Sequence, residues 1–258
     1  MAQDLTATAN LSAQLATYRI REAIRRISSG KKTFYGGGAS TSSAYSIAAE
    51  GAAKYGASLN LEDALAALSI AQTSLDEIAN LNQRLAELGT LQSNNSLLST
   101  EDTASLNKET ASITSAIDNI VSNTKYNNIA LLGTSDISLS VGAGAYGGSN
   151  PLTITIGGIS SIASVTAASN ATSTSNTLTS TLGTNQGQVT GASTAAEARR
   201  NTSSTAAALL KSAAENIESA DLAAETAKLT KNVLLNKVSL SLAAQVNNLD
   251  RSKLDLLG

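Results

Sequence analysis

Apolar residues recur at steps of three and four along most of the chain, which is the spacing of one face of an α-helix. The first such stretch covers roughly residues 5–31, and Gly30 is the residue type that commonly ends a helix. A second stretch repeats leucine from Leu61 to Leu88 over about four heptads and predicts a long helix that packs against a partner helix. A third helix is predicted from Thr100, whose hydroxyl is expected to cap it.

The spacing of apolar residues changes from helical to alternating after Asn128. Residues 137–141 and 152–156 each alternate apolar with polar side chains, and a glycine-rich link joins them, so the pattern predicts one β-hairpin. Residues 160–181 are rich in Ser, Thr and Ala, and they fit either a solvated loop or a weak helix. From about residue 178 a faint heptad register begins, and a firm helical pattern then continues to the end of the chain.

The composition removes most kinds of catalytic and metal site. The chain has no Cys and no His, which excludes disulfides, zinc–thiolate sites and His-dependent catalytic triads. Neighbouring carboxylates such as Glu62-Asp63 and Glu101-Asp102 could serve acid–base chemistry, but the sequence supplies no pocket or nucleophile for them. A solvated helix face explains them better. We therefore expect no enzyme activity, no cofactor and no metal.

The charge pattern bears on partners. The 258 residues carry a net charge of −2, with no 18-residue apolar run and no basic-then-apolar N-terminal segment. We therefore expect no nucleic-acid partner, no membrane insertion and no cleaved signal peptide. A basic cluster within residues 19–32 has two interpretations. One is contact with nucleic acid or membrane, and the favoured one is pairing with the acidic run within residues 215–225.

Both ends of the chain are predicted amphipathic helices with apolar faces. A lone helix is marginal in water, so the two ends most simply pair with each other, and any remaining apolar surface pairs with neighbouring molecules. This arrangement favours polymerisation. The residues expected to carry self-assembly are Leu11, Leu15, Ile24, Ile27, Leu234, Leu242, Val246, Leu249, Leu256 and Leu257.

A series of short motifs resembles bacterial flagellins in the order in which that family carries them. Their order over residues 1–157 and 178–258 is specific, although no single motif is. The acidic pair usual after Ser-Ser-Gly and the Pro usual before the terminal Leu-Leu are absent here. The motifs that carry the resemblance are Ser28-Ser29-Gly30, Ser69–Ile78, Gln83–Leu88, Lys125–Asn128 with Leu131-Leu132, Ile217–Glu225 and Leu242–Asn247.

The resemblance implies a mainly α fold, an elongated antiparallel bundle of long helices with one β-hairpin and a terminal coiled coil made by the two chain ends. The implied segments are residues 1–40 (N-terminal helix of an inner domain, plus a joint), 41–136 (N-terminal helices of a rod domain), 137–157 (its hairpin), 158–181 (a short Ser/Thr-rich surface segment), 182–217 (C-terminal helix of the rod domain) and 218–258 (C-terminal helix of the inner domain).

The resemblance also implies a function. The chain is expected to be a structural subunit that polymerises with itself into the flagellar filament, with a hook–filament junction protein as the alternative. Implied partners are hook-associated and cap proteins, an export chaperone at the C-terminal helix, and the innate receptor Toll-like receptor 5. The implied location is extracellular, after export by the flagellar type III apparatus without signal cleavage.

Three further groups of residues are singled out as sites. A patch on the second helix matches the family's protofilament contact and receptor surface, although core packing is the favoured interpretation of Leu88. Four charged residues are expected to set the register of the joint. A Ser/Thr group fits either O-glycosylation or a plain spacer. The patch on the second helix consists of Gln83, Arg84, Glu87 and Leu88. The charged residues of the joint are Arg25, Arg26, Glu218 and Asp221. The Ser/Thr group consists of Ser169, Thr172, Ser173, Thr174 and Ser175.

Overall fold

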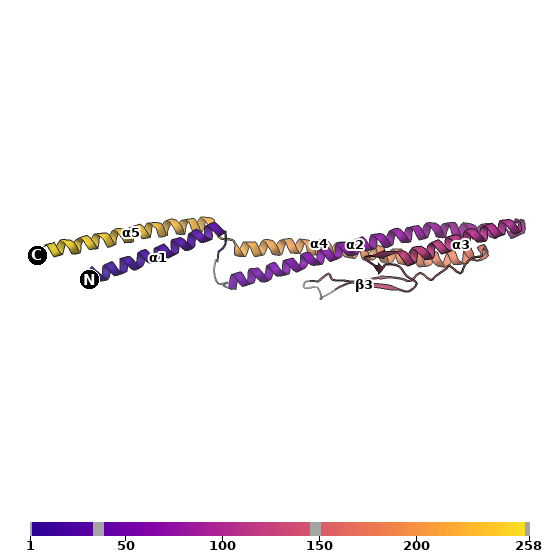
Figure 1. Cartoon of the computed structure of the whole chain (residues 1–258), viewed down its shortest axis with the longest axis horizontal. Helices are drawn as coiled ribbons and strands as arrows, with labels where there is room; N and C mark the ends of the chain where they lie inside the picture. Colours follow the sequence, from indigo (N-terminus) through magenta and orange to yellow (C-terminus); the bar gives the residue numbers. More distant parts are fainter. Residues whose placement is uncertain (1, 33–38, 145–150, 256–258) are drawn as a thin grey trace. The chain divides into compact units, whose positions relative to one another are not determined.

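The computed structural model describes residues 2–32, 39–144 and 151–255. The chain divides into two compact units, one made of Met1–Ala49 with Leu210–Gly258 and the other of Glu50–Leu209. The structure is 79% helical, so the predicted mainly α class is confirmed. The described residues form five α-helices, and the β-hairpin lies within the second unit, where Figure 1 labels β3.

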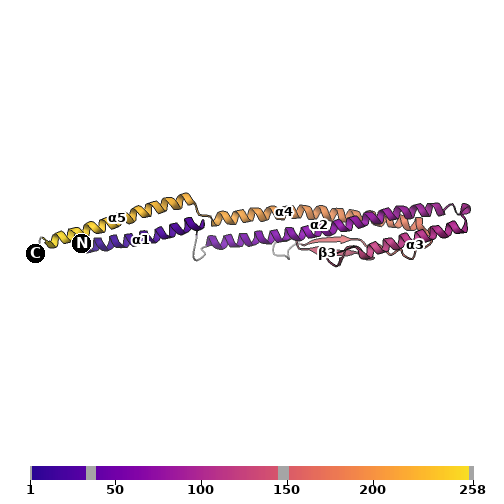
Figure 2. The same ribbon diagram turned by 45° about the horizontal axis from the view of Figure 1, so that its top comes forward.

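The first unit is built on helices α1 (Ala2–Ser29) and α5 (Leu222–Asp255), which lie side by side and antiparallel in both views (Figures 1 and 2). Gly30 ends α1 with a positive φ of 67°, a conformation that glycine adopts without steric cost. The backbone just beyond α1 pairs with the backbone that follows α4. Lys32 N–H donates to Glu218 O, and Ala220 N–H donates to Gly30 O, both at 2.8 Å.

The second unit is built on α2 (Ala39–Gln92), α3 (Thr100–Asn123) and α4 (Ala171–Glu218), with α3 and α4 antiparallel to α2 (Figure 2). The division between the two units falls within α2 and α4. The predicted leucine seam of α2 forms the centre of the core. Its fully buried members are Leu61, Leu68, Leu75, Ile78, Leu85 and Leu88, which pack in one cluster with Ile117, Leu178 and Leu182.

The predicted hairpin is confirmed as β3 (Ile137–Val141) and β4 (Leu152–Ile156), paired antiparallel with Ile137 opposite Ile156 and Val141 opposite Leu152. A second, smaller hairpin that the sequence analysis did not predict joins β1 (Lys125–Tyr126) to β2 (Ile129–Ala130). Its two turn residues, Asn127 and Asn128, both have positive φ, as the tightest hairpin turns require.

Helix α3 begins at Thr100 as predicted, but its predicted cap is wrong by one residue. Ser99, not Thr100, caps α3, because its hydroxyl accepts from Asp102 N–H at 3.0 Å while the Asp102 carboxylate accepts from Ser99 N–H at 3.1 Å. Of the two alternatives for residues 160–181, the helix holds for residues 171–181, because α4 begins at Ala171, directly after the 3₁₀ turn Ala168–Asn170.

The C-terminal helical pattern is interrupted. α4 ends at Glu218 and α5 begins at Leu222. Asp221 causes the restart, because its carboxylate accepts from Ala224 N–H at 3.0 Å and so caps α5.

Candidate self-assembly surfaces

The seam between α1 and α5 is made of small side chains. Ala9, Ala13, Ala16 and Ala23 recur at helical spacing on α1 and are all buried. Their counterparts on α5 are Ala243 and Val246. Alanines let two helices approach closely, so α1 and α5 pack against each other mainly through small side chains and not through their large apolar residues.

Most of the large apolar residues of α1 and α5 lie outside that seam. Leu11 is 67% exposed and Leu234 is 62% exposed, and Leu15, Ile24 and Leu242 are also exposed. Of the predicted self-assembly residues whose side chains the structure describes, only Val246 is buried, and Ile27 is half-buried. Exposed large apolar side chains in this number are typical of an interface. The side chain of Leu249 and the residues Leu256 and Leu257 lie outside the described part of the structure.

The predicted pairing between the basic and acidic clusters is present, and two of the four residues singled out take part in it: Glu218 pairs with Lys31, and Arg26 pairs with Glu225. Lys31 Nζ lies 3.0 Å from Glu218 Oε2, and this contact raises the pKa of Lys31. Asp221 serves as the helix cap described above, and Arg25 lies on the exposed side of α1. That Arg25, Arg26, Glu218 and Asp221 together set the register of the joint stays a prediction.

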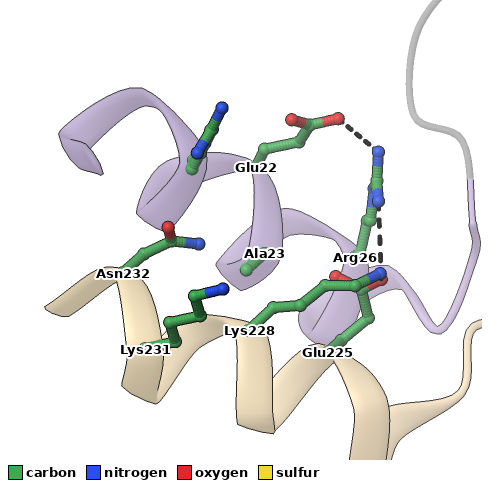
Figure 3. Close-up of a pocket in the computed structure, with 8 residues that line it drawn as sticks. Glu22, Ala23, Arg26, Glu225, Lys228, Lys231 and Asn232 are labelled. Carbon is green, nitrogen blue, oxygen red and sulfur yellow. Dashed lines mark hydrogen bonds and ion pairs between the residues drawn. The ribbon is translucent and has the colours of Figure 1, made fainter. Parts of the chain in front are cut away.

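Glu225 is the buried member of the charge cluster. Its carboxylate accepts from Lys228 Nζ at 2.7 Å and from Arg26 Nη1 at 3.4 Å (Figure 3). Arg26 also pairs with Glu22, one turn earlier on α1. The hydrogen bond from Lys228 lowers the pKa of Glu225 and outweighs the opposing effect of burial. Arg26 thus ties α1 to α5 through Glu225, a link that the sequence analysis included only as part of an acidic run.

The patch on α2 is an exposed ion network with one buried neighbour. Arg84 Nη1 lies 2.8 Å from Glu87 Oε2, and Arg84 Nε lies 2.8 Å from Glu109 Oε1 on α3. These two carboxylates raise the pKa of Arg84. Gln83 is also exposed, but Leu88 is 0% exposed. Leu88 belongs to the core because it continues the leucine seam, which confirms core packing, its favoured interpretation, and removes it from the predicted contact patch.

The predicted Ser/Thr surface is only partly a surface. Ser169, Thr172 and Ser173 are exposed and Thr174 is half-exposed. Ser175 is buried against α2, and its hydroxyl donates to the Asn82 backbone carbonyl at 3.2 Å. Ser175 is therefore removed from the predicted glycosylation sites.

A buried polar contact between α2 and α4 was missed by the sequence analysis. The Asn82 side-chain amide donates to Ser175 O at 3.2 Å and to Thr179 Oγ1 at 2.9 Å. The signal was present, since Asn82 takes the next position, seven residues on, in the series Leu61, Leu68 and Leu75. A single Asn at such a position fixes the register of paired helices.

Within the described ranges, no three His, Cys, Asp or Glu side chains come together as a metal site. A separate search of those same residues finds no helix with the length and hydropathy that crossing a membrane requires. The candidate surfaces described above are exposed apolar side chains and exposed ion networks on long helices. These features characterise a protein that acts by packing against other proteins.

Comparisons with known proteins identify the class. The family model for the bacterial flagellin N-terminal helical region matches residues 3–136, just over half of the chain. The chain is 28% identical over 212 residues to a flagellin of Halalkalibacterium halodurans, covering 78% of this chain and 77% of that protein. A crystal structure of Bacillus cereus flagellin is 24% identical, with a TM-score of 0.38, over 57% of this chain and 85% of that one.

The chain belongs to the bacterial flagellin family. It is a structural subunit of the flagellar filament, and the predicted family and function are both confirmed.

Proposed function

We propose that filament assembly is carried by the apolar side chains that α1 and α5 leave exposed. The observation that supports this is the reversal of size at their seam, where alanines lie inside and leucines outside. Fully burying one Leu or Ile side chain contributes roughly 1.5–3 kcal/mol. Five such side chains, repeated in every subunit, supply enough free energy to hold a polymer: Leu11, Leu15, Ile24, Leu234 and Leu242.

The geometry of such contacts decides what kind of assembly forms. The exposed residues lie on two different helices, so the surface that one copy offers need not be the surface that it meets on the next copy. Heterologous contacts that do not close on themselves give a helical filament and not a ring.

Seeded growth tests this proposal. Fragments of native filament are mixed with the full chain or with a chain lacking residues 219–258, and fibre length is measured by electron microscopy. We expect long fibres from the full chain and none from the shortened one. Normal fibres from the shortened chain would contradict the proposed role of α5.

The ion pairs at the end of α1 are proposed to set the register of the joint between the terminal helices. Lys31 and Glu218 are the matched pair for a test, because they lie 3.0 Å apart. Reversing Lys31 to Glu should reduce polymer yield, and adding Glu218→Lys should restore part of it. Equal yields from all variants would refute this role.

Gln83, Arg84 and Glu87 are proposed as a contact between subunits of one protofilament and as the surface that Toll-like receptor 5 reads on monomers. Their exposure supports both roles. Arg84→Ala should weaken signalling in receptor-bearing cells without unfolding the helix, because Arg84 bonds only to exposed carboxylates. Undiminished signalling would count against the receptor role.

The remaining family expectations concern export, partner proteins and glycosylation. We propose export through the flagellar type III apparatus without signal cleavage, an export chaperone at α5, contacts with cap and hook-associated proteins, an extracellular location and no enzymatic activity. Whether Ser169, Thr172, Ser173 and Thr174 carry sugar or form a plain spacer is decided by the intact mass of native filaments. No observation favours the hook–filament junction alternative.

A further inference from the structure

A pocket of about 310 Å³ lies between the facing sides of α1 and α5, near the end of α1 (Figure 3). Both helices belong to the same compact unit. The pocket is lined almost entirely by charged and amide side chains: Arg19, Glu22, Ala23 and Arg26 from α1, and Glu225, Lys228, Lys231 and Asn232 from α5.

The charges of the pocket do not cancel. Its four cations face two carboxylates, and those two are already paired, Glu22 with Arg26 and Glu225 with both Arg26 and Lys228. Arg19 and Lys231 form no ion pair with any residue in the described ranges. The pocket therefore presents two unneutralised cations from two facing helices.

Asn232 gives an independent indication of a ligand. It is only 9% exposed, yet its side-chain amide makes no hydrogen bond to the residues that the structure describes. Figure 3 shows this amide pointing from α5 toward α1, into the same space as the Lys231 ammonium. The Asn232 side-chain atoms are not among the fully enclosed polar atoms without a partner, so they reach the space of the pocket, where the amide N–H group can donate to a ligand.

The surrounding charge favours an anion. The sequence has a net charge of −2, but Met1–Ala49 and Leu210–Gly258 together contain twelve Lys or Arg and only eight Asp or Glu. The positive charge is thus concentrated in the unit that contains the pocket. A local excess of one sign raises the concentration of the opposite ion at that surface.

We propose that this pocket binds a free inorganic oxyanion of the phosphate or sulfate class. The Asn232 amide N–H group and the Arg19 and Lys231 side chains donate to the anion, and the Glu225 pairs hold the two helices in place around it. Each of these donors is of the type that recognises oxyanions, and charge-assisted hydrogen bonds are the stronger kind.

The test titrates the dilute, unpolymerised full chain with inorganic phosphate against sodium chloride at equal ionic strength, followed by NMR. We expect saturable shifts of the Asn232 side-chain amide and of Lys231 with phosphate only. The double variant Arg19→Gln, Lys231→Gln should weaken binding at least tenfold. The matched control Arg21→Gln, Lys237→Gln removes the same two charges from the same helices outside this pocket, and should weaken binding less than twofold.

A separate variant removes the amide donor. Asn232→Leu keeps a side chain of similar volume at a buried position, and far-UV circular dichroism confirms that the helices remain. We expect a loss of phosphate affinity of at least fivefold.

Three results would overturn the proposal. The first is NMR shifts that do not saturate as phosphate is added. The second is an equal loss of phosphate binding in the control variant Arg21→Gln, Lys237→Gln. The third is a wild-type monomer that binds no phosphate, together with loss of filament assembly in the variant Arg19→Gln, Lys231→Gln. The last result would assign the pocket to a carboxylate of a second copy. Fibre growth by the wild-type chain is scored separately, so the assembly proposal stands or fails independently of the anion site.

Discussion

Three glycines on α4 give the sharpest prediction about stability. Gly183, Gly187 and Gly191 lie four residues apart on an exposed face, and a Cβ atom added at any of them would meet nothing within 4 Å. Glycine inside a helix is about 0.8–1 kcal/mol less favourable than alanine, because the unfolded chain loses more freedom there. Replacing all three with alanine should therefore stabilise the second unit by roughly 2–3 kcal/mol.

The same substitution on the facing helix should have the opposite sign. A Cβ atom at Gly89 would clash with the Thr172 hydroxyl and would lie 2.6 Å from the Thr172 backbone nitrogen. The first turn of α4 would have to move away from α2. We expect Gly89→Ala to destabilise the protein by about 1–3 kcal/mol, as overpacking does.

The assay is thermal unfolding of the unpolymerised chain, followed by circular dichroism at the helical band. For a unit of this size each kcal/mol shifts the midpoint by roughly 2–4 °C, so the triple alanine variant should gain about 4–12 °C and Gly89→Ala should lose several degrees. A triple variant no more stable than wild type would refute the reasoning, as would an unchanged midpoint for Gly89→Ala.

The remaining predictions concern the core, the surface and pH. Leu85→Ala should cost about 2–5 kcal/mol in denaturant unfolding, because Leu85 is fully buried, whereas Leu97→Ala, at a side chain 87% exposed, should change little. Folding lowers the pKa of Glu225 below its ordinary value of 4.5. The ionised carboxylate therefore stabilises the folded state at a pH above 4.5, and this contribution is lost as the pH falls below that value. Glu225→Gln should reduce the fall of the thermal unfolding midpoint at acidic pH. An unchanged dependence of the midpoint on pH would contradict this role of Glu225.

The sequence predicts elements well where one kind of residue dominates a face. The leucine seam of α2 and the alternating strands β3 and β4 were recognised because large apolar side chains mark the buried side. The start of α4 has no such row of large apolar side chains on its buried side. Its first turns are mostly Ser and Thr, which are weak helix formers, and they are held by Ala171 and Leu178 packing in the core and by Ser175 bonding to α2.

The surfaces were harder to predict than the elements. Periodicity showed that α1 and α5 have apolar residues at helical spacing, but it could not show that alanines make the seam and that Leu11 and Leu234 remain outside. Nor could it show the break at Asp221, because a helix restart depends on one side-chain hydrogen bond. The pocket at Asn232 depends on two helices meeting, which no single stretch of sequence reveals.

The most direct test of the assembly account uses the absence of cysteine from the sequence, because a single introduced thiol is then a unique probe. Leu11→Cys and Leu234→Cys are labelled with a maleimide, once as monomers and once as intact filaments. The account predicts rapid labelling of both monomers and at least a tenfold slower reaction in the filaments, where copies of the chain cover these positions. Equal labelling rates in filaments and monomers would contradict it.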